Sequence, residues 1–312
     1  MYQAIGRLLG STLYEDFMAD YWGRECLLSK GEPARFGDLF SWSGLETLLG
    51  TQRFDFPRLR LVRKGKVIPA EGYMELKRDR RSNPYVAHVS AKISAEMSTG
   101  AMLHIAAVHD AWAPLAAFAA ALEHDLGASV QVNLHAALAR SRGFSTHWDG
   151  HDVFVVQVTG KKAWRLFGVT ESAPLAVAPD QKGSAPQQHM KEVVLETGDM
   201  LYVPRGYWHS AEALDDVSLH LTFAVQYPNG IEFLQWLAED LKTNVEFRRD
   251  ISRFALTQNE GEKKYLDAIR QAIIATLTRD GLEKFLQAYE SKLGVTNQVQ
   301  LDGGDGNESE RD

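Results

Sequence analysis

The sequence predicts an α+β fold in which a β-rich core, built as a barrel, lies between two helical regions. Residues 130–225 consist of short apolar segments separated by Gly and Pro, which is typical of β-strands. Residues 12–50 and the segment after residue 230 instead carry apolar side chains at helical spacing. Residues 217–225 alternate large apolar with small polar side chains, as expected for a barrel strand with one packed face and one face toward a polar lumen.

Short helices are expected in the N-terminal region. TLYEDFMADYW, residues 12–22, has helical spacing. FSWSGLETLLG, residues 40–50, has Ser43 as a candidate cap and Gly50 as a stop signal. Two short helices are therefore predicted ahead of the core.

A hairpin and a longer helix should follow these helices. FPRLRLVRKGKVIP, residues 56–69, alternates on each side of Lys64-Gly65, which predicts two strands and a turn. The amphipathic pattern of residues 111–126 ends at Gly127, which predicts a helix with a glycine stop.

The strands of the core are predicted from β-branched and aromatic runs. Two of these runs, Val153 to Val158 and Ala163 to Phe167, are joined by a tight Thr159-Gly160 turn. The others are VQVNLHAAL, VVLETGDMLYVP with its Gly198-Asp199 turn, and VSLHLTFAV. After residue 230, IEFLQWLAEDLK, KKYLDAIRQAIIATL and GLEKFLQAYESKL predict three helices.

The composition of the chain argues against a nucleic-acid-binding protein, a disulfide-stabilised protein and a membrane-spanning protein. The net charge is −7, of which residues 297–312 carry −4, so the rest of the chain is at −3 and argues against nucleic acid as a partner. The basic cluster KRDRR, residues 77–81, is interpreted as a solvated loop. The single Cys26 fits a small packed side chain in a reducing compartment, and hence the cytoplasm. The apolar run 111–122 is too short to cross a membrane.

A candidate metal site begins just ahead of the strand 153–158. His147 and Asp149 are two residues apart, so in an extended chain both side chains point to the same face. A Pro-Arg-Gly loop about sixty residues later leads to His209 at the start of the next strand. Two histidines and one carboxylate make the facial triad of non-haem Fe(II) oxygenases. A closed structural zinc site usually needs cysteines, and the chain has only Cys26.

Four stretches resemble one known family. They are YWGRECLL (21–28), NLH (133–135), GFSTHWDGHDVFVVQVTGKKAWRLF (143–167) and TGDMLYVPRGYWH (197–209). They resemble the JmjC-type cupin oxygenases, in particular the ribosomal oxygenase (ribosomal protein hydroxylase) group, over about residues 14 to 230. The resemblance implies a double-stranded β-helix (cupin or jelly-roll) core, Fe(II) as cofactor and 2-oxoglutarate as co-substrate.

The resemblance also assigns roles to residues. The family's iron ligands fall on His147, Asp149 and His209, and its basic residue for the distal carboxylate of 2-oxoglutarate falls on Lys162. A solvated hairpin lysine is the alternative for Lys162. Asn133 matches a position that lines the co-substrate pocket.

Three further pocket positions are left open. His135 stands where many relatives have a tyrosine. His220 and Thr222 face the expected lumen and either hydrogen-bond the co-substrate or substrate or are satisfied interior polar residues. His151 is interpreted as a surface residue.

Four regions follow from this interpretation. Residues 1–110 form an N-terminal helical and hairpin region that completes the barrel, and residues 111–228 form the JmjC/cupin catalytic core. Residues 229–296 form a C-terminal helical region, and residues 297–312 a disordered acidic tail. The helical region is short for the dimerisation helices and winged-helix domain of the ribosomal oxygenases, but long enough to pair two subunits as a homodimer.

The expected function is an Fe(II)- and 2-oxoglutarate-dependent oxygenase, a hydroxylase that uses dioxygen to oxidise a side chain of a protein or peptide. Succinate and CO2 are the expected co-products. Two alternatives stay open: a metal-binding cupin that acts as a sensor or binding module without oxidation, and a hydroxylase or demethylase of nucleic acid or of a free small molecule. The sequence does not distinguish hydroxylation from demethylation.

Overall fold

The computed structural model describes residues 3–175, 183–188, 190–251 and 259–293. The chain divides into two compact units, Met1–Pro228 and Asn229–Asp312. The predicted acidic tail lies outside the described residues. The four regions expected from the sequence stay a prediction.

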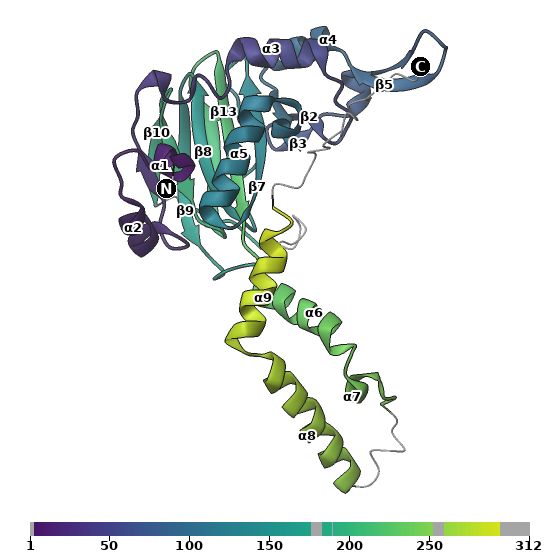
Figure 1. The fold of residues 1–312 in the computed structure, drawn as a ribbon. Helices are drawn as coiled ribbons and strands as arrows, with labels where there is room; N and C mark the ends of the chain where they lie inside the picture. Colours follow the sequence, from purple (N-terminus) through teal and green to yellow (C-terminus); the bar gives the residue numbers. More distant parts are fainter. Residues whose placement is uncertain (1–2, 176–182, 189, 252–258, 294–312) are drawn as a thin grey trace, which may run out of the picture. The chain divides into compact units, whose positions relative to one another are not determined.

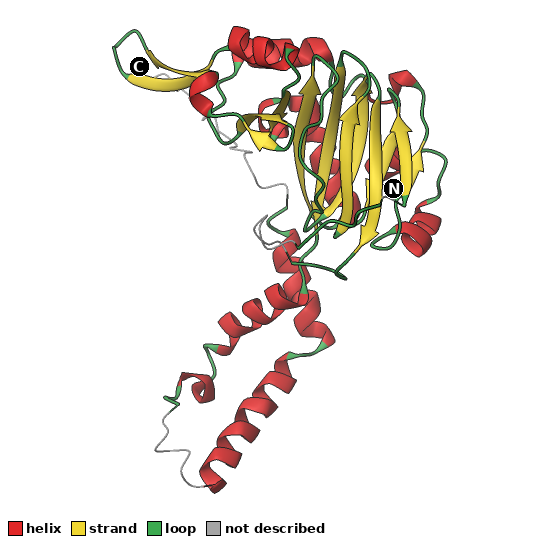
Figure 2. Ribbon diagram, turned by 180° about the vertical axis from the view of Figure 1, so that it is seen from behind, coloured by secondary structure: helices red, strands yellow, loops and turns green. Residues whose placement is uncertain are grey.

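The first unit is built on antiparallel sheets, which Figure 2 shows from the side opposite Figure 1. The larger sheet has the strand order β1 (Leu27–Ser29), β11 (Met200–Val203), β8 (Asp152–Thr159), β13 (Ser218–Gln226), β7 (Ser129–Ala137), β6 (Met102–Ile105), β2 (Leu59–Arg63) and β3 (Lys66–Val67). The smaller sheet has the order β10 (Lys191–Leu195), β9 (Lys162–Val169) and β12 (Tyr207–Ala213). A separate hairpin joins β4 (Met74–Arg78) to β5 (Pro84–His88).

Helical segments lie around these sheets. They are α1 (Gln3–Leu9), α2 (Tyr14–Asp16), α3 (Trp42–Thr51), α4 (Ser90–Ser98) and α5 (Ala113–Leu126), with single turns η1 (Phe17–Tyr21), η2 (Pro33–Phe36), η3 (Ala70–Gly72) and η4 (Val108–Ala111). The predicted ends of α3 were wrong. Ser41, not Ser43, is the cap, because its side chain accepts a hydrogen bond from the Gly44 N–H, and the helix continues one residue past Gly50. Helix α5 ends as predicted, at Gly127 with a φ of 62°.

The larger sheet packs its outer face against helices. Figure 1 shows α5 lying across this face. The apolar residues of β13, namely Leu219, Leu221, Phe223 and Val225, are buried in the main core cluster together with Leu115 and Leu122 of α5. Truncation of one such side chain to alanine removes about 2–5 kcal/mol of folding free energy. The predicted outward apolar face of this strand is confirmed.

The side chains that face the inside of the barrel differ in polarity between strands β13 and β8. The inward face of β13 is polar, as predicted. The inward residues of β8, Val153 and Val155, instead join a second apolar cluster with Trp164 and Leu166 of β9. The space between the sheets is therefore filled by apolar side chains in one part and is left polar in another.

Strands β8 and β9 follow each other in the sequence but do not pair. Strand β8 pairs with β11 and β13, whereas β9 pairs with β10 and β12. The turn between them contains Gly160 with a φ of 71°, where an added Cβ would lie 2.0 Å from the Val217 carbonyl oxygen. The predicted tight turn is thus a crossover between sheets rather than a hairpin, and it places Lys162 on the smaller sheet.

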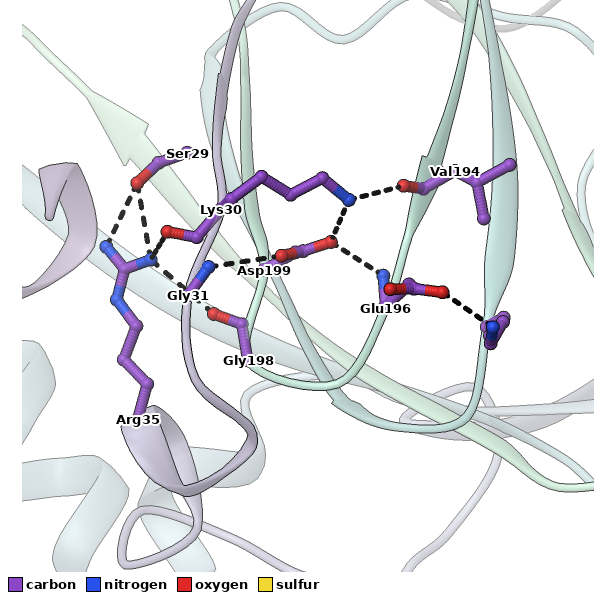
Figure 3. Close-up of polar contacts among 9 residues, drawn as sticks. Ser29, Lys30, Gly31, Arg35, Val194, Glu196, Gly198 and Asp199 are labelled. Atoms are coloured by element: carbon purple, nitrogen blue, oxygen red, sulfur yellow. Dashed lines mark hydrogen bonds and ion pairs between the residues drawn. The ribbon is translucent and has the colours of Figure 1, made fainter.

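The predicted Gly198-Asp199 turn fixes the N-terminal strand β1 to the barrel (Figure 3). The buried Asp199 carboxylate accepts hydrogen bonds from the Lys30 ammonium (2.7 Å), the Gly31 N–H (3.2 Å) and the Glu196 N–H (2.8 Å). Strand β1 itself pairs with β11. The N-terminal region is therefore part of the sheet that carries the core.

The basic cluster 77–81 lies on the β4–β5 hairpin. Its residues are exposed at the end of β4 and in the following turn. Asp79 accepts hydrogen bonds from the Arg81 and Asn83 N–H groups (2.7 and 2.9 Å) and so closes the turn.

The second unit contains α6 (Gly230–Leu241), α7 (Val245–Arg248), α8 (Asn259–Thr276) and α9 (Arg279–Glu290). A capping box between Asn229 and Glu232 begins α6. Phe285 of α9 is buried against Phe233 and Trp236 of α6, with ring centroids 5.2 and 5.9 Å apart. Within the described ranges, no helix has the length and apolar character needed to cross a membrane.

Candidate metal centre

The two predicted histidine ligands come from segments that are hydrogen-bonded to each other. The His147 N–H donates to the His209 carbonyl (3.0 Å), and the His209 N–H donates to the His147 carbonyl (2.8 Å). Residues that exchange both backbone bonds in an antiparallel pair lie opposite each other, with side chains on the same side. The two imidazole centroids are accordingly 4.5 Å apart.

The carboxylate of Asp149 completes the group. Its Oδ1 lies 3.7 Å from His147 Nε2 and its Oδ2 lies 3.6 Å from His209 Nε2. One donor atom from each of the three residues lies within 4.8 Å of the other two. The structure thus brings together the three residues that the sequence singled out, including the expected i, i+2 arrangement of His147 and Asp149.

Backbone carbonyls orient both imidazole rings. His147 Nδ1 lies 2.8 Å from the Ser145 carbonyl oxygen, and His209 Nδ1 lies 2.9 Å from the Tyr207 carbonyl oxygen. A neutral imidazole that donates from Nδ1 presents the lone pair of Nε2 to a metal ion. Strand β12 also has a register shift between Trp208 and His209, which re-aims the His209 side chain relative to a regular strand.

This donor set fits a divalent transition-metal ion such as Fe(II). Two imidazole nitrogens and one carboxylate oxygen on one side of an ion are the ligands of the facial triad, and they leave coordination positions open. None of the three ligands is a thiolate, which a closed structural zinc site would usually contain. Cys26 is half-buried against the second apolar cluster, where burial raises the pKa of its thiol. It is a packed side chain, as predicted.

A cavity of about 720 Å³ contains these three side chains. All other candidate residues also line it: Asn133, His135, Lys162 and Thr222. His220 lines it as well, and the half-exposed His151, which was interpreted as a surface residue, lies at its wall.

Lys162 is the buried cation of this cavity. It is 4% exposed, which rules out the alternative of a solvated hairpin lysine. Its ammonium lies 3.1 Å from His220 Nδ1. Burial lowers the pKa of Lys162 to about 7, because the loss of hydration disfavours the charged form of the side chain. A carboxylate at this position would restore the charged form.

A row of basic side chains crosses the larger sheet beside Lys162. Arg60, His104, His135 and His220 are direct cross-strand partners on β2, β6, β7 and β13. The rings of His135 and His220 are stacked 4.5 Å apart, and Arg60 Nε donates to His104 Nδ1 (3.3 Å). Burial lowers the pKa values of His135 and His220 well below their usual value, so both rings are neutral.

Asn133 and Thr222 are also cross-strand partners. The Asn133 side-chain oxygen accepts hydrogen bonds from the Ala107 N–H (3.1 Å) and from Gln131 Nε2 (2.8 Å). This oxygen therefore holds the loop after β6 and is not available as an acceptor for a ligand. Thr222 lines the cavity from the neighbouring strand.

Trp164 also lines the cavity, although it was not predicted from the sequence as a site residue. Its ring lies 5.7 Å from that of His209 and 5.6 Å from that of His220, and its indole N–H is buried without a hydrogen-bond partner among the described residues. A buried donor without a partner at a cavity wall fits an acceptor supplied by a ligand. The i, i+2 spacing from Lys162 on β9 was the available signal.

The residues present also fit a dicarboxylate such as 2-oxoglutarate. The cavity has a candidate metal site, an unpaired indole donor and a buried lysine. A ligand with a chelating end and a distal carboxylate needs a metal at one end and a cation at the other.

Comparison with known proteins agrees with the sequence resemblance. Residues 110–233 match the JmjC domain family. Human ribosomal oxygenase 1 is 29% identical over 250 residues, which are 77% of this chain and 38% of that protein. The rat ribosomal oxygenase 1 is 30% identical over 257 residues, 79% of this chain and 42% of that protein. A Drosophila grimshawi protein named bifunctional lysine-specific demethylase and histidyl-hydroxylase NO66 is 27% identical over 304 residues, 93% of this chain and 40% of that protein. The chain thus spans less than half the length of these relatives.

Solved structures show a similar fold. The Escherichia coli ribosomal oxygenase YcfD in complex with cobalt and 2-oxoglutarate superposes with a TM-score of 0.57 at 18% identity, over 90% of this chain and 71% of that chain. Its complex with cobalt and succinic acid gives a TM-score of 0.57 at 17% identity, over 94% of this chain and 73% of that chain. The expected cupin-like fold is confirmed. This chain contains a JmjC domain and is related to the ribosomal oxygenases.

Proposed function

We propose that this protein is an Fe(II)- and 2-oxoglutarate-dependent oxygenase that hydroxylates a side chain of a protein or peptide. The observation that carries the proposal is the position of the His147, Asp149 and His209 donor atoms in the same cavity as the buried Lys162. The Escherichia coli YcfD complexes with cobalt and 2-oxoglutarate or succinic acid support the same ligands.

Each side chain has a distinct task in this proposal. His147, Asp149 and His209 hold the metal, with both imidazoles fixed by backbone carbonyls. Lys162 pairs with the distal carboxylate, and Trp164 donates its indole N–H to an oxygen of the bound dicarboxylate. The neutral His135 and His220 rings exclude water from this end of the cavity without adding charge. Bound Fe(II) with 2-oxoglutarate supplies the activation of dioxygen and the oxidation of a C–H bond, with succinate and CO2 as co-products.

A spectroscopic experiment tests the proposal. Anaerobic addition of Fe(II) and 2-oxoglutarate should give a metal-to-ligand charge-transfer band, and His147→Ala should abolish it. His124→Ala is the matched control, because this histidine is 90% exposed on α5 and outside the cavity. A charge-transfer band of equal intensity in His147→Ala would remove the assigned ligand set.

The reaction is tested separately by its products. Incubation with peptides from ribosomal and other cellular proteins should yield succinate together with peptides that have gained one oxygen atom, as read by mass spectrometry. Metal binding without succinate formation for any peptide would instead support the sensor or binding-module alternative. Loss of a methyl group from lysine would favour the demethylase activity that the Drosophila relative's name includes.

We also propose that the protein is a cytoplasmic homodimer paired through its C-terminal helices. The support is the exposed apolar surface of the second unit, which includes Ile231, Leu234, Leu282 and Leu286. Light scattering on the purified chain should give twice the monomer mass, and Leu234→Glu with Leu286→Glu should reduce it to one monomer mass. A monomer at micromolar concentration would overturn this assembly.

A further inference from the structure

A second cavity of about 740 Å³ lies directly beside the metal-site cavity. The two cavities share lining residues, among them Gly65, Gly143 and Ser145. The β2–β3 turn builds this common wall: the Lys64 N–H donates to the Arg142 carbonyl (3.1 Å) and the Gly65 N–H to the Gly143 carbonyl (2.8 Å). A Cβ added at Gly65 would lie 2.0 Å from Ser145 Oγ, so the two segments are in close contact.

The second cavity is lined by cations. We call it the basic groove, defined by Arg63, Lys64, Arg140, Arg142 and Arg165. Glu212 is the one acidic residue among its described lining residues. The metal-site cavity carries a different charge pattern, since Lys162 is buried and the histidines beside it, His135 and His220, are neutral.

Some cations of the basic groove are already paired with carboxylates. Arg63 contacts Glu96 at 2.6 Å, and Arg142 and Arg165 share Glu212 at 3.0 and 3.2 Å.

Two other cations are unpaired. Lys64 and Arg140 are exposed and have no ion-pair partner within the described part of the chain. Arg140 uses its Nε to donate to the Leu214 carbonyl (2.9 Å), which fixes the base of the guanidinium. Both side chains are therefore available for an external anion, and that of Arg140 is also held in place.

We infer that the basic groove binds an acidic side chain of the polypeptide substrate, a few residues from the side chain that enters the metal-site cavity. This inference rests on the proposed function. An extended chain that passes over the Gly65–Gly143 wall presents neighbouring side chains to both cavities. Guanidinium groups match the geometry of a carboxylate. The arginines of the groove already form ion pairs with three carboxylates of this chain, in the groove or at its edge.

Charge favours a carboxylate over a nucleic-acid backbone. Three carboxylates, Glu96, Glu192 and Glu212, offset part of the charge of the five cations. Binding to a phosphate backbone strengthens with each phosphate that is neutralised, so it needs a longer run of unpaired cations. One acidic side chain needs only the pair Lys64 and Arg140.

The test measures binding and does not depend on turnover. The test uses two fluorescein-labelled peptide pools of random sequence. Each peptide is about twelve residues long, which is tens of ångströms in extended form. The pools differ only at the flanking positions, which hold Asp and Glu in one pool and Asn and Gln in the other. Fluorescence anisotropy with Zn(II)-loaded protein and 2-oxoglutarate should show about tenfold tighter binding of the acidic pool at low salt, a preference that falls as salt is raised.

Variants then locate the preference. Lys64→Glu with Arg140→Glu should remove the preference for the acidic pool, and Lys64→Gln with Arg140→Gln should reduce it. Arg80→Glu with Arg81→Glu on the exposed β4–β5 turn changes the net charge equally and should leave it intact. Co(II) absorbance checks that each variant keeps its metal site.

Several outcomes would overturn the inference. They are equal binding of the two pools, no binding of either pool, a preference that survives the Lys64 and Arg140 substitutions, or tighter binding of a random single-stranded RNA that depends on the same two residues. Succinate formation without an acidic preference would leave the proposed function standing and remove this inference alone. A groove-dependent acidic preference without any succinate formation would remove the proposed function and leave the basic groove as a peptide-binding surface.

Discussion

The two ends of the metal-site cavity are built in different ways. At the metal end, the side chains of His147 and Asp149 are 31% and 27% exposed, and the imidazoles are held by backbone carbonyls. At the basic end, Lys162 and His220 are 4% and 3% exposed and contact each other. The proposed metal ligands His147 and Asp149 are thus partly exposed, and the two imidazoles are held in fixed orientations. The basic end keeps the Lys162 side chain away from water, which is the environment that the proposed pairing with a distal carboxylate requires.

Asp149→Asn should have the largest effect and should affect the metal end alone. The amide keeps the shape of the side chain but removes the anionic ligand, so Co(II) affinity should fall by at least about 100-fold. Titration followed by Co(II) absorbance measures this loss. The same substitution at Asp38, which is exposed and does not line the cavity, is the control. Unchanged Co(II) affinity in Asp149→Asn would contradict the metal assignment.

Lys162→Met should weaken 2-oxoglutarate binding at the basic end without changing metal binding at the metal end. It leaves the distal carboxylate buried without a cation, so the 2-oxoglutarate dissociation constant should rise about 100-fold, or about 3 kcal/mol. Co(II) affinity should not change. Calorimetry with Zn(II)-loaded protein gives the 2-oxoglutarate dissociation constant, and titration of the metal-free protein followed by Co(II) absorbance gives the metal affinity. Lys161→Met, which changes an exposed neighbour, should alter neither. Equal loss of metal affinity would show that the ends are not independent.

The pH dependence of 2-oxoglutarate binding should come from Lys162 at the basic end. Since the pKa of Lys162 is lowered to about 7 in the free site, the lysine is increasingly neutral above that pH. The bound dicarboxylate favours the charged form, so binding takes up a proton above pH 7 and weakens by up to about tenfold per pH unit. Calorimetry in two buffers with different ionisation enthalpies measures the proton uptake. Lys162→Met should show none.

Trp164→Phe should have the smallest effect. It removes one neutral hydrogen-bond donor and keeps most of the packed ring, so 2-oxoglutarate should bind about three- to tenfold more weakly. Metal affinity should stay the same. Trp208→Phe is a useful control, because the indole N–H of Trp208 already donates to Thr170 at 2.7 Å. If Trp164→Phe binds 2-oxoglutarate as tightly as the unmodified chain, the unpaired indole is not a ligand donor.

The sequence predicted the metal end better than the basic end, for a physical reason. His147 and Asp149 share a face because of local i, i+2 geometry, and the Pro-Arg-Gly loop marks the strand that carries His209. The row from Arg60 to His220 depends on the register of four strands far apart in the sequence, which no local pattern specifies. The pairing of β8 and β9 with different partners likewise depends on the closure of the barrel. Strands β1 and β6 were missed because each is too short for a clear alternation.

The Asp199 contacts with Lys30 and Gly31 tie the N-terminal strand β1 to the segment that matches the JmjC domain family. A chain trimmed to residues 110–233, the part that matches the JmjC domain family, would lose β1 from one side of the larger sheet and β6 from the other. Both flanks would then offer open backbone donors and acceptors to other molecules, which invites aggregation. The segment that matches the family is consequently smaller than the sheet to which it belongs, and strands from the first 110 residues cover both of its flanks.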